Sequence, residues 1–278
     1  MAKSPYKTLN KAPQLSLGLM SGKDEGVAQN DAKAIESCRL AAEQGRADAQ
    51  YNLGLMYWNG QGVKQNNAEA IKWYRFSANR GYADAQWRLG EIYEYGRGVE
   101  KNDAEAVSLY RLAAKQGYAG AQWCLGERYE NGKGVEKNDA EAMRLYLLAA
   151  DQGHADARFK LGWVYENGQG VEKNDAEAMR RYRRAAAQNH AEAKCNLGWM
   201  YRNGQGVDKN NAEAVKWYRL AAAQGHADAQ WCLGMMYENG KGVKQNEAEA
   251  KKWYTLAADQ GHAEARRDLE WMCENGRG

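Results

Sequence analysis

The chain has 278 residues, with 39 basic and 36 acidic side chains and a net charge of +3. Because the two signs nearly balance, there is no global reason to expect a nucleic-acid or anionic-membrane partner. Only two prolines occur, Pro5 and Pro13, alanine is abundant, and almost no segment alternates like a strand. This composition predicts an all-α protein.

Residues 1–13 are interpreted as an N-terminal extension. The lysines of this segment precede the run "APQLSLGLM", which faintly resembles a secretory signal peptide, but the run is short and broken by Gln14 and Ser16. Leu17 also stands 36 residues before Leu53 in the same local sequence, so this segment is already a repeat. We therefore expect a cytoplasmic protein, or a periplasmic or secreted one if the N-terminus is processed. No run is long and apolar enough to span a bilayer.

Residues 14–45 are interpreted as a degenerate capping repeat, because Ser21 and Asp24 stand where later copies have a tyrosine and a loop glycine. Six regular repeats follow over 46–261. The last segment, 262–278, is predicted to be a C-terminal capping helix, since it is charged where earlier copies are apolar or small. Polar terminal units are expected at the ends of a stacked repeat array.

The loop "NGKGVEKND" at 131–139 invites a nucleotide-binding interpretation, because glycines flank a lysine. Close copies recur every 36 residues, none contains a Gly-Lys-Ser/Thr sequence, and no strand-like run precedes any of them. A phosphate-binding loop needs that local sequence between a strand and a helix. The loop is therefore interpreted as a connection that the architecture repeats.

One unit, 118–153, predicts two antiparallel helices. Its first half has an apolar stripe that includes Leu125 and Tyr129, and glycines then interrupt the helix. Asn138 followed by Glu141 predicts an N-cap with a capping-box partner at the start of the second helix. Neither helix can bury its stripe alone, so consecutive units must stack.

Two glycine columns have backbone explanations. Gly153 and its equivalents end the second helix, and the exception, Asn189, is the next residue most tolerant of a left-handed conformation. Gly126 and its equivalents lie in the middle of the first helix, where glycine costs about 1 kcal/mol relative to alanine. We expect that cost to be offset by close approach of the paired helix.

The pattern "ADAQWxLGxxYxNGxGVxxNxAEAxxWYRxAAxQG" resembles the Sel1-like repeat family, which is related to tetratricopeptide repeats. The resemblance covers residues 14–278 and is carried by the L-G-x-x-Y, G-x-G-V and W-Y-x-x-A-A-x-Q-G segments. It implies a right-handed α/α superhelical solenoid of about seven 36-residue helix pairs plus a capping helix. It also implies a bacterial scaffold or adaptor that binds another protein or peptide, with no catalytic residues to transfer.

Two other functions stay open at this stage. Some bacterial members of the family resemble immunity or inhibitor proteins that neutralise a toxin, and hydrolase activity has been suggested for other relatives. No serine, cysteine or aspartate has a neighbouring histidine at useful helical spacing, so no residue set supports an enzyme. We expect no cofactor.

Metal binding is not expected. The histidines occupy one position of successive repeats, and equivalent atoms in neighbouring units lie about 10 Å or more apart, whereas zinc ligands lie about 2 Å from the metal. A packing role at the helix start is predicted for this column: His154, His190, His226 and His262. The cysteines form no paired columns, so we expect reduced thiols. The densest basic cluster, Arg180, Arg181, Arg183 and Arg184, is interpreted as a solvated helix surface.

The candidate partner-binding residues lie at three positions of the first helix, counted from its central glycine. Positions −3 and +1 are four residues apart and share a helix face, and they vary while the apolar stripe stays constant. In the related tetratricopeptide repeats the equivalent positions line the concave groove. Packing between neighbouring first helices is the equally weighted alternative. With position +4, the candidates are Tyr51, Leu55, Trp58, Trp87, Glu91, Glu94, Trp123, Glu127, Glu130, Phe159, Trp163, Glu166, Trp199, Arg202, Trp231, Met235 and Glu238.

The acidic residues among these candidates suggest the chemistry of the partner. Position −6 is mostly acidic, which a helix N-terminus favours, but the glutamates at +4 lie near the C-terminus, where a carboxylate is mildly unfavourable. Either a neighbouring Arg or Lys or a bound basic segment must compensate. We therefore expect a partner with a basic segment, which excludes nucleic acid, and a monomeric protein with no membrane partner.

Overall fold

The computed structural model describes residues 35–274, which are helical or loop throughout with no strand. Contacts divide the chain into two compact units, Met1–Trp73 and Tyr74–Gly278. The predicted extension 1–13, the signal-peptide question and most of the capping repeat 14–45 lie outside the described residues. Over the part of the chain that is described, no helix has the length and apolar character to cross a membrane.

The fold is an all-α solenoid of helix pairs, as the sequence predicted. In the first unit, residues 35–43 are helical and α2 (Ala47–Asn59) follows, while α3 (Asn67–Asn79) contains the boundary between units. The second unit contains α4 (Ala83–Tyr95), α5 (Asp103–Lys115), α6 (Ala119–Asn131), α7 (Asp139–Asp151), α8 (Ala155–Asn167), α9 (Asp175–Ala186), α10 (Ala191–Asn203), α11 (Asn211–Ala222), α12 (Ala227–Glu238), α13 (Glu247–Asp259) and α14 (Ala263–Glu274).

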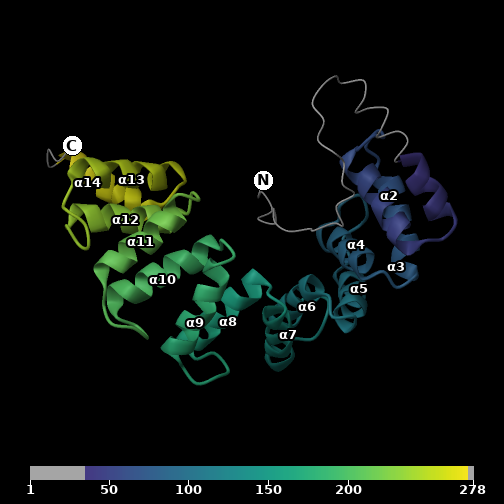
Figure 1. Cartoon of the computed structure of the whole chain (residues 1–278), viewed down its shortest axis with the longest axis horizontal. Coiled ribbons are helices and arrows are strands. Elements are labelled where there is room, and N and C mark those ends of the chain that lie inside the picture. The colour runs from purple at the N-terminus through teal and green to yellow at the C-terminus, as the bar shows by residue number, and fades with distance from the viewer. Residues whose placement is uncertain (1–34, 275–278) are drawn as a thin grey trace. The chain divides into compact units, whose positions relative to one another are not determined.

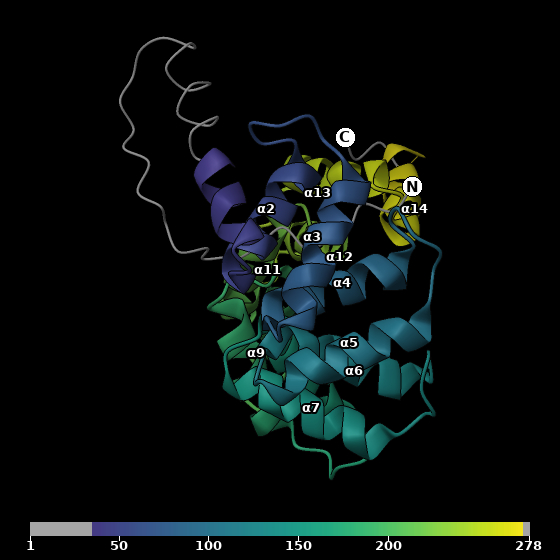
Figure 2. The same cartoon turned by 90° about the vertical axis from the view of Figure 1, so that its right-hand side faces the viewer.

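Within the second unit the helices pack in chain order. Each even-numbered helix from α4 to α12, here called a first helix, packs most extensively on the odd-numbered second helix that follows it. Each second helix then contacts the first helix of the next repeat. Figures 1 and 2 both show α5, α6 and α7 following one another in this way. Each repeat therefore contacts mainly its neighbours, as a solenoid requires.

The caps of the helices follow the sequence, with one difference. The side chain of Asn138 accepts the backbone N–H of Glu141 at 3.0 Å, as predicted for an N-cap. The prediction that the Glu141 side chain accepts a hydrogen bond from the backbone N–H of Asn138 is wrong. The N–H of Asn138 already donates to the carbonyl of Tyr129 at 2.9 Å, so the Glu141 carboxylate binds Arg144 at 2.6 Å instead.

The glycine explanations are confirmed. Gly153 has a φ of 98° and Asn189 a φ of 69°, both in the left-handed region expected at a helix end. A Cβ added to Gly126 would lie 2.6 Å from Cε1 of Tyr146, whose ring is buried on α7. The central glycine therefore makes room for the tyrosine of the paired helix, and Gly90, Gly162, Gly198 and Gly234 do the same for the equivalent tyrosine.

The second loop glycine joins consecutive repeats. A Cβ on Gly134 would overlap the backbone carbonyl of Asp103, the first residue of α5 in the preceding repeat. Gly206 and Gly242 lie in the same way against Asp175 and Asn211. Gly170 is different, because no atom lies within 4 Å of the place its Cβ would take. The contact between the α8 loop and the start of α7 is therefore open.

Candidate functional site

A tyrosine hydroxyl meets the position +4 glutamate in several repeats. Tyr110 donates to Glu94 at 2.6 Å, and Tyr146 donates to Glu130 at 2.7 Å. The same bond occurs in two further repeats. Tyr182 donates to Glu166 at 2.6 Å, and Tyr254 donates to Glu238 at 2.8 Å. Each bond links the two helices of one repeat at the end of the first helix.

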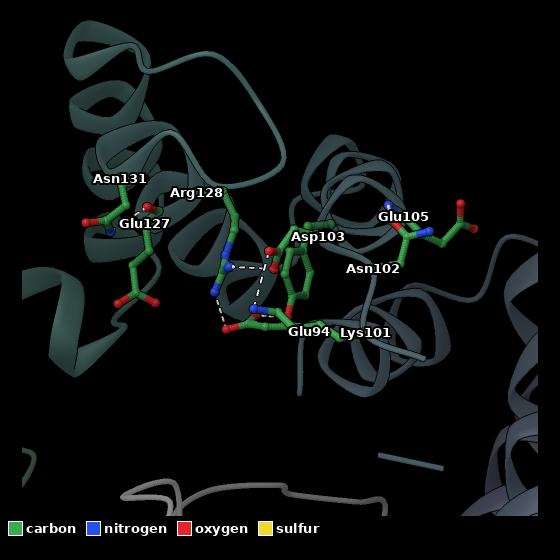
Figure 3. Close-up of polar contacts among 9 residues, drawn as sticks. Glu94, Lys101, Asn102, Asp103, Glu105, Glu127, Arg128 and Asn131 are labelled. Carbon is green, nitrogen blue, oxygen red and sulfur yellow. Dashed lines mark hydrogen bonds and ion pairs between the residues drawn. The ribbon is translucent and has the colours of Figure 1, made fainter. Parts of the chain in front are cut away.

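Two of these glutamates also pair with a cation of the next repeat. Arg128 on α6 reaches Glu94 on α4 and, at 3.3 Å, Asp103 on α5, as Figure 3 shows. Lys160 on α8 lies 2.7 Å from Glu130. The compensation that the sequence required at position +4 is thus supplied from within the chain, so these carboxylates do not themselves call for a basic partner.

The repeat of α10 and α11 breaks this pattern. Its +4 residue is Arg202, so Tyr218 has no carboxylate where four other repeats of the second unit have one. The ring of Tyr218 is fully buried, and its hydroxyl has no hydrogen-bond partner among the described residues. Arg202 is half-buried, and the described part of the chain offers it no ion pair.

The rings at position −3 pack against the start of the next first helix. Trp87 contacts Tyr118 with 5.4 Å between ring centroids, Trp123 stacks on His154 at 5.6 Å, and Phe159 stacks on His190 at 4.6 Å. Trp231 contacts His262 in the same way at 5.2 Å. This column therefore packs between neighbouring repeats, one of the two roles that the sequence left open.

The histidine column has the predicted helix-start role. Nδ1 of His190 accepts the backbone N–H of Ala193 at 3.2 Å, so the ring proton lies on Nε2, which is 3.2 Å from the Asp156 carboxylate of the preceding repeat. His262 caps α14 and contacts Asp228 in the same way. No cluster of potential metal ligands occurs among residues 35–274.

Position +1 is more accessible than position −3. Trp199 is 41 % exposed, whereas Trp123 at position −3 is only 8 % exposed. Trp163 is half-buried and lies under the Lys160 ammonium at 4.9 Å, and Met235 is also half-buried. The side of α4, α6, α8, α10 and α12 that carries positions −3 and +1 is called the first-helix face below.

A hollow of about 360 Å³ lies on the first-helix face between α8, α10 and α12. Phe159 and Trp163 of α8 line it, together with Cys195 of α10 and Asp228 of α12. Cys195 stands at position −3, where α8 and α12 have Phe159 and Trp231, so the smaller side chain leaves room. Here the structure brings together the −6, −3 and +1 positions that the sequence placed on one face.

Two glutamates at position +1, Glu91 and Glu127, have raised pKa values. Burial raises the pKa of Glu91, against the opposing effect of Arg88 at 2.9 Å. Burial, with a further contribution from the neighbouring Glu94 carboxylate, raises the pKa of Glu127 to about 7. Figure 3 shows that Glu127 and Arg128 project to different sides of α6, and no ion pair holds Glu127 among the described residues.

The candidates in the first unit are less exposed than expected for a binding surface. Tyr51 is 6 % exposed, and Leu55 and Trp58 are half-buried on α2. These residues belong to the unit Met1–Trp73, and the candidate site lies in the second unit.

The sequence assigned the cysteines to reduced thiols and the arginine cluster to a solvated helix surface. The cysteines Cys38, Cys124, Cys195, Cys232 and Cys273 are unpaired. In the arginine cluster, the interpretation as a solvated surface is wrong for Arg181, which is 8 % exposed and bound to Glu177 at 2.7 Å. Arg180 is exposed beside the same glutamate, and Arg183 donates to the Tyr201 hydroxyl at 2.7 Å.

Sequence reasoning missed two surface features. The open contact at Gly170 leaves a hollow of about 690 Å³ lined by Met143, Lys137 and Val164 among others. The second helices other than α9, which has Arg184 there, also present one exposed apolar residue at the same repeat position: Phe76, Leu112, Leu148, Leu220 and Leu256. The 36-residue spacing of that column is a signal that could have revealed it.

The Sel1 repeat model matches the chain seven times, over residues 14–45, 47–82, 83–118, 119–154, 155–190, 191–226 and 227–262. Among curated proteins, none is significantly similar to this chain.

Solved structures give two close likenesses. The chain is 35 % identical to c5321, a protective antigen of uropathogenic Escherichia coli with an SLR fold, over 87 % of this chain and 52 % of that one, with a TM-score of 0.81. The chain therefore spans about half the length of that antigen. It is 33 % identical to a Sel1 repeat protein from Oxalobacter formigenes over 89 % of this chain and 74 % of that one, with a TM-score of 0.78.

A more distant likeness concerns the fold alone. The immunity protein PA5088 from Pseudomonas aeruginosa is 21 % identical over 78 % of this chain and 82 % of that one, with a TM-score of 0.50.

Proposed function

The chain belongs to the Sel1 repeat family, and from that premise we propose that it is a non-enzymatic scaffold that binds a partner protein or peptide on its first-helix face. The observation that carries this proposal is the hollow between α8, α10 and α12, with the exposed ring of Trp199 on α10. Large aromatic side chains beside a concave surface are the usual anchors of protein interfaces. The unpaired thiols fit a reducing compartment such as the cytoplasm, which is part of the same proposal.

A basic stretch of the partner is proposed to lie near Glu127. This carboxylate is largely buried near Glu94 and Glu130, with no ion pair among the described residues, and its pKa is raised to about 7. A Lys or Arg head from a partner would favour the charged carboxylate and relieve that repulsion. The other acidic candidates contribute less to this argument, because Glu94 and Glu130 already pair with Arg128 and Lys160.

The test of the scaffold function starts from a partner captured with the full chain and then purified. Its affinity is measured by calorimetry for the wild type and for a Trp163→Ala/Trp199→Ala double variant. We expect the double variant to bind at least about tenfold more weakly, since buried aromatic anchors carry much of the binding energy of an interface.

The matched control is Leu112→Ala/Leu220→Ala, which removes apolar side chains that are 48 % and 50 % exposed on the second helices. Its affinity should stay close to the wild-type value. Equal losses in the two double variants, or a loss confined to the leucine variant, would contradict binding on the first-helix face. A captured partner that is a toxin, inactivated when bound, would assign the scaffold to immunity.

A further inference from the structure

The repeats provide internal controls for the site at Arg202. In four of them the buried tyrosine of the second helix donates its hydroxyl proton to the +4 glutamate of the first helix. In the repeat of α10 and α11 the tyrosine remains as Tyr218, but the glutamate is replaced by Arg202. The hydroxyl donor of Tyr218 is therefore retained, but the position of its carboxylate acceptor is occupied by the cationic Arg202.

The exchange leaves polar groups without strong partners. The hydroxyl of Tyr218 is fully buried. The groups that act on it are the thiols of Cys195 and Cys232, which are weak acceptors, and the guanidinium of Arg202, which cannot accept a hydrogen bond. A buried hydroxyl without a good acceptor destabilises the folded state. Glutamate at position 202 would remove this defect, as four repeats of the second unit show. The pattern of those four repeats is therefore broken at Arg202 without an internal gain. Such positions are where function is expected.

The acidic groups of neighbouring repeats do not satisfy Arg202. Glu166 accepts from Tyr182, and Glu238 accepts from Tyr254. Asp228 lies 3.2 Å from His262. Glu192 is exposed at the rim of the hollow, and no ion pair with Arg202 occurs among the described residues. The guanidinium therefore remains available to an anion from outside the chain.

The geometry points to a docking site in which Arg202 and Tyr218 bind a carboxylate side chain, Asp or Glu, of the partner segment. The carboxylate takes the place that the chain's own glutamate occupies in four other repeats. Arg binds carboxylates through two parallel N–H donors, and the Tyr218 hydroxyl adds a third. Trp199 lies one helical turn before Arg202 on the same face and is 41 % exposed, so it receives the apolar residue next to the acid.

This inference rests on the proposed function and adds a direction to it. The partner's basic stretch lies toward α6, where Glu127 is unpaired, and its acidic residue lies toward α10. A segment with this charge order fits in one orientation only, because the reversed segment would place like charges together at both ends.

The test uses a blocked peptide of alternating leucine and glutamate, with the glutamine analogue as control. Indole N–H signals of the full-length protein are recorded by NMR, and the Trp199 signal is identified by its loss in Trp199→Phe. The glutamate peptide should shift the Trp199 signal, and the glutamine peptide should not. Arg202→Glu should abolish the response and raise the Tm by a few degrees, because Tyr218 gains its acceptor. Arg202→Lys should keep a weaker response.

The control for net charge is Arg184→Glu, which makes the same charge change on an exposed residue of a second helix and should respond like the wild type. Equal shifts with the two peptides, no shift in the wild type, or an undiminished response in Arg202→Glu would overturn the inference. The proposed function fails separately, through the affinity of the purified partner for the Trp163→Ala/Trp199→Ala variant. If the glutamate peptide did not shift the Trp199 signal while the Trp163→Ala/Trp199→Ala variant still bound the partner more weakly, only the carboxylate site would be contradicted.

Discussion

The hydroxyl of Tyr146 on α7 donates to the carboxylate of Glu130 on α6 at 2.7 Å, and the ring of the same tyrosine fills the space beside Gly126. One side chain thus makes both the apolar and the polar link between the helices of a repeat. Lys160 of the next repeat extends the polar link across the junction. The repeat is held by this combination, and its absence at Arg202 is the reason that we propose binding there.

Removing the hydroxyl should have opposite consequences in two repeats. Tyr146→Phe loses a hydrogen bond to a charged acceptor, which we expect to cost about 1.5–3 kcal/mol of unfolding free energy. Tyr218→Phe removes a hydroxyl without a hydrogen-bond partner and should be neutral or stabilising. Urea unfolding of both variants gives the comparison. Similar losses in the two would show that Tyr218 has an acceptor that the pattern does not reveal.

A single methyl group at the central glycine should destabilise its repeat. In Gly126→Ala the new Cβ would lie 2.6 Å from the ring of Tyr146, so the helices must separate, at an expected cost of about 1–3 kcal/mol. Gly120→Ala places the same methyl in the same helix, 3.1 Å from the edge of the Tyr118 ring, which can shift slightly. Its urea midpoint should stay near the wild-type value or rise. A Gly126→Ala midpoint equal to that of Gly120→Ala would remove the close-packing argument.

The contact between successive repeats can be isolated with two loop glycines. Gly134 and Gly170 have φ values of 73° and 69°, so an alanine at either position is strained to a similar degree. Only Gly134→Ala also drives a methyl into the carbonyl of Asp103. Thermal unfolding should therefore show a clearly larger loss for Gly134→Ala. Equal losses would mean that backbone strain accounts for both and that the loop does not seat on the preceding repeat.

Glu127 should make stability depend on pH. Its folded pKa of about 7 lies above the ordinary glutamate value of 4.5, so the folded protein binds the proton more tightly than the unfolded chain. The resulting stabilisation is fully present below about pH 4.5 and is lost as the pH rises through about 7. It amounts to at most about 3 kcal/mol and less where water reaches the group. The free energy of unfolding, measured from pH 5 to 8, should fall more steeply for the wild type than for Glu127→Gln. Parallel curves would contradict the raised pKa.

The sequence was sufficient for the fold because the period and the glycines are local signals. Gly126 in mid-helix predicted a close helix contact, and Asn138 predicted a helix start, both of which the structure has. The partner of Gly126 could not be named, since that depends on how two helices are offset along their axes.

The site was harder to predict for the same reason. Equivalent positions in the aligned repeats show which residues recur. They do not show which position of one repeat contacts which position of the next. Trp123 therefore could stack on His154 or face outward with equal support, and the structure has it stacked. The exception at Arg202 was visible as a break in its column, but its meaning required the bond between Tyr146 and Glu130 to be known.

The measurement that tests the scaffold proposal most directly is site-specific photo-crosslinking of the full-length protein in its source cell. A benzophenone amino acid replaces Trp199 on the first-helix face or Leu148 on a second helix, two side chains of almost equal exposure at 41 % and 40 %. We predict that position 199 crosslinks one protein partner, that Arg202→Glu reduces the yield, and that position 148 does not crosslink that partner. Crosslinking of the same partner from position 148 with equal yield, or from position 148 alone, would contradict binding on the first-helix face.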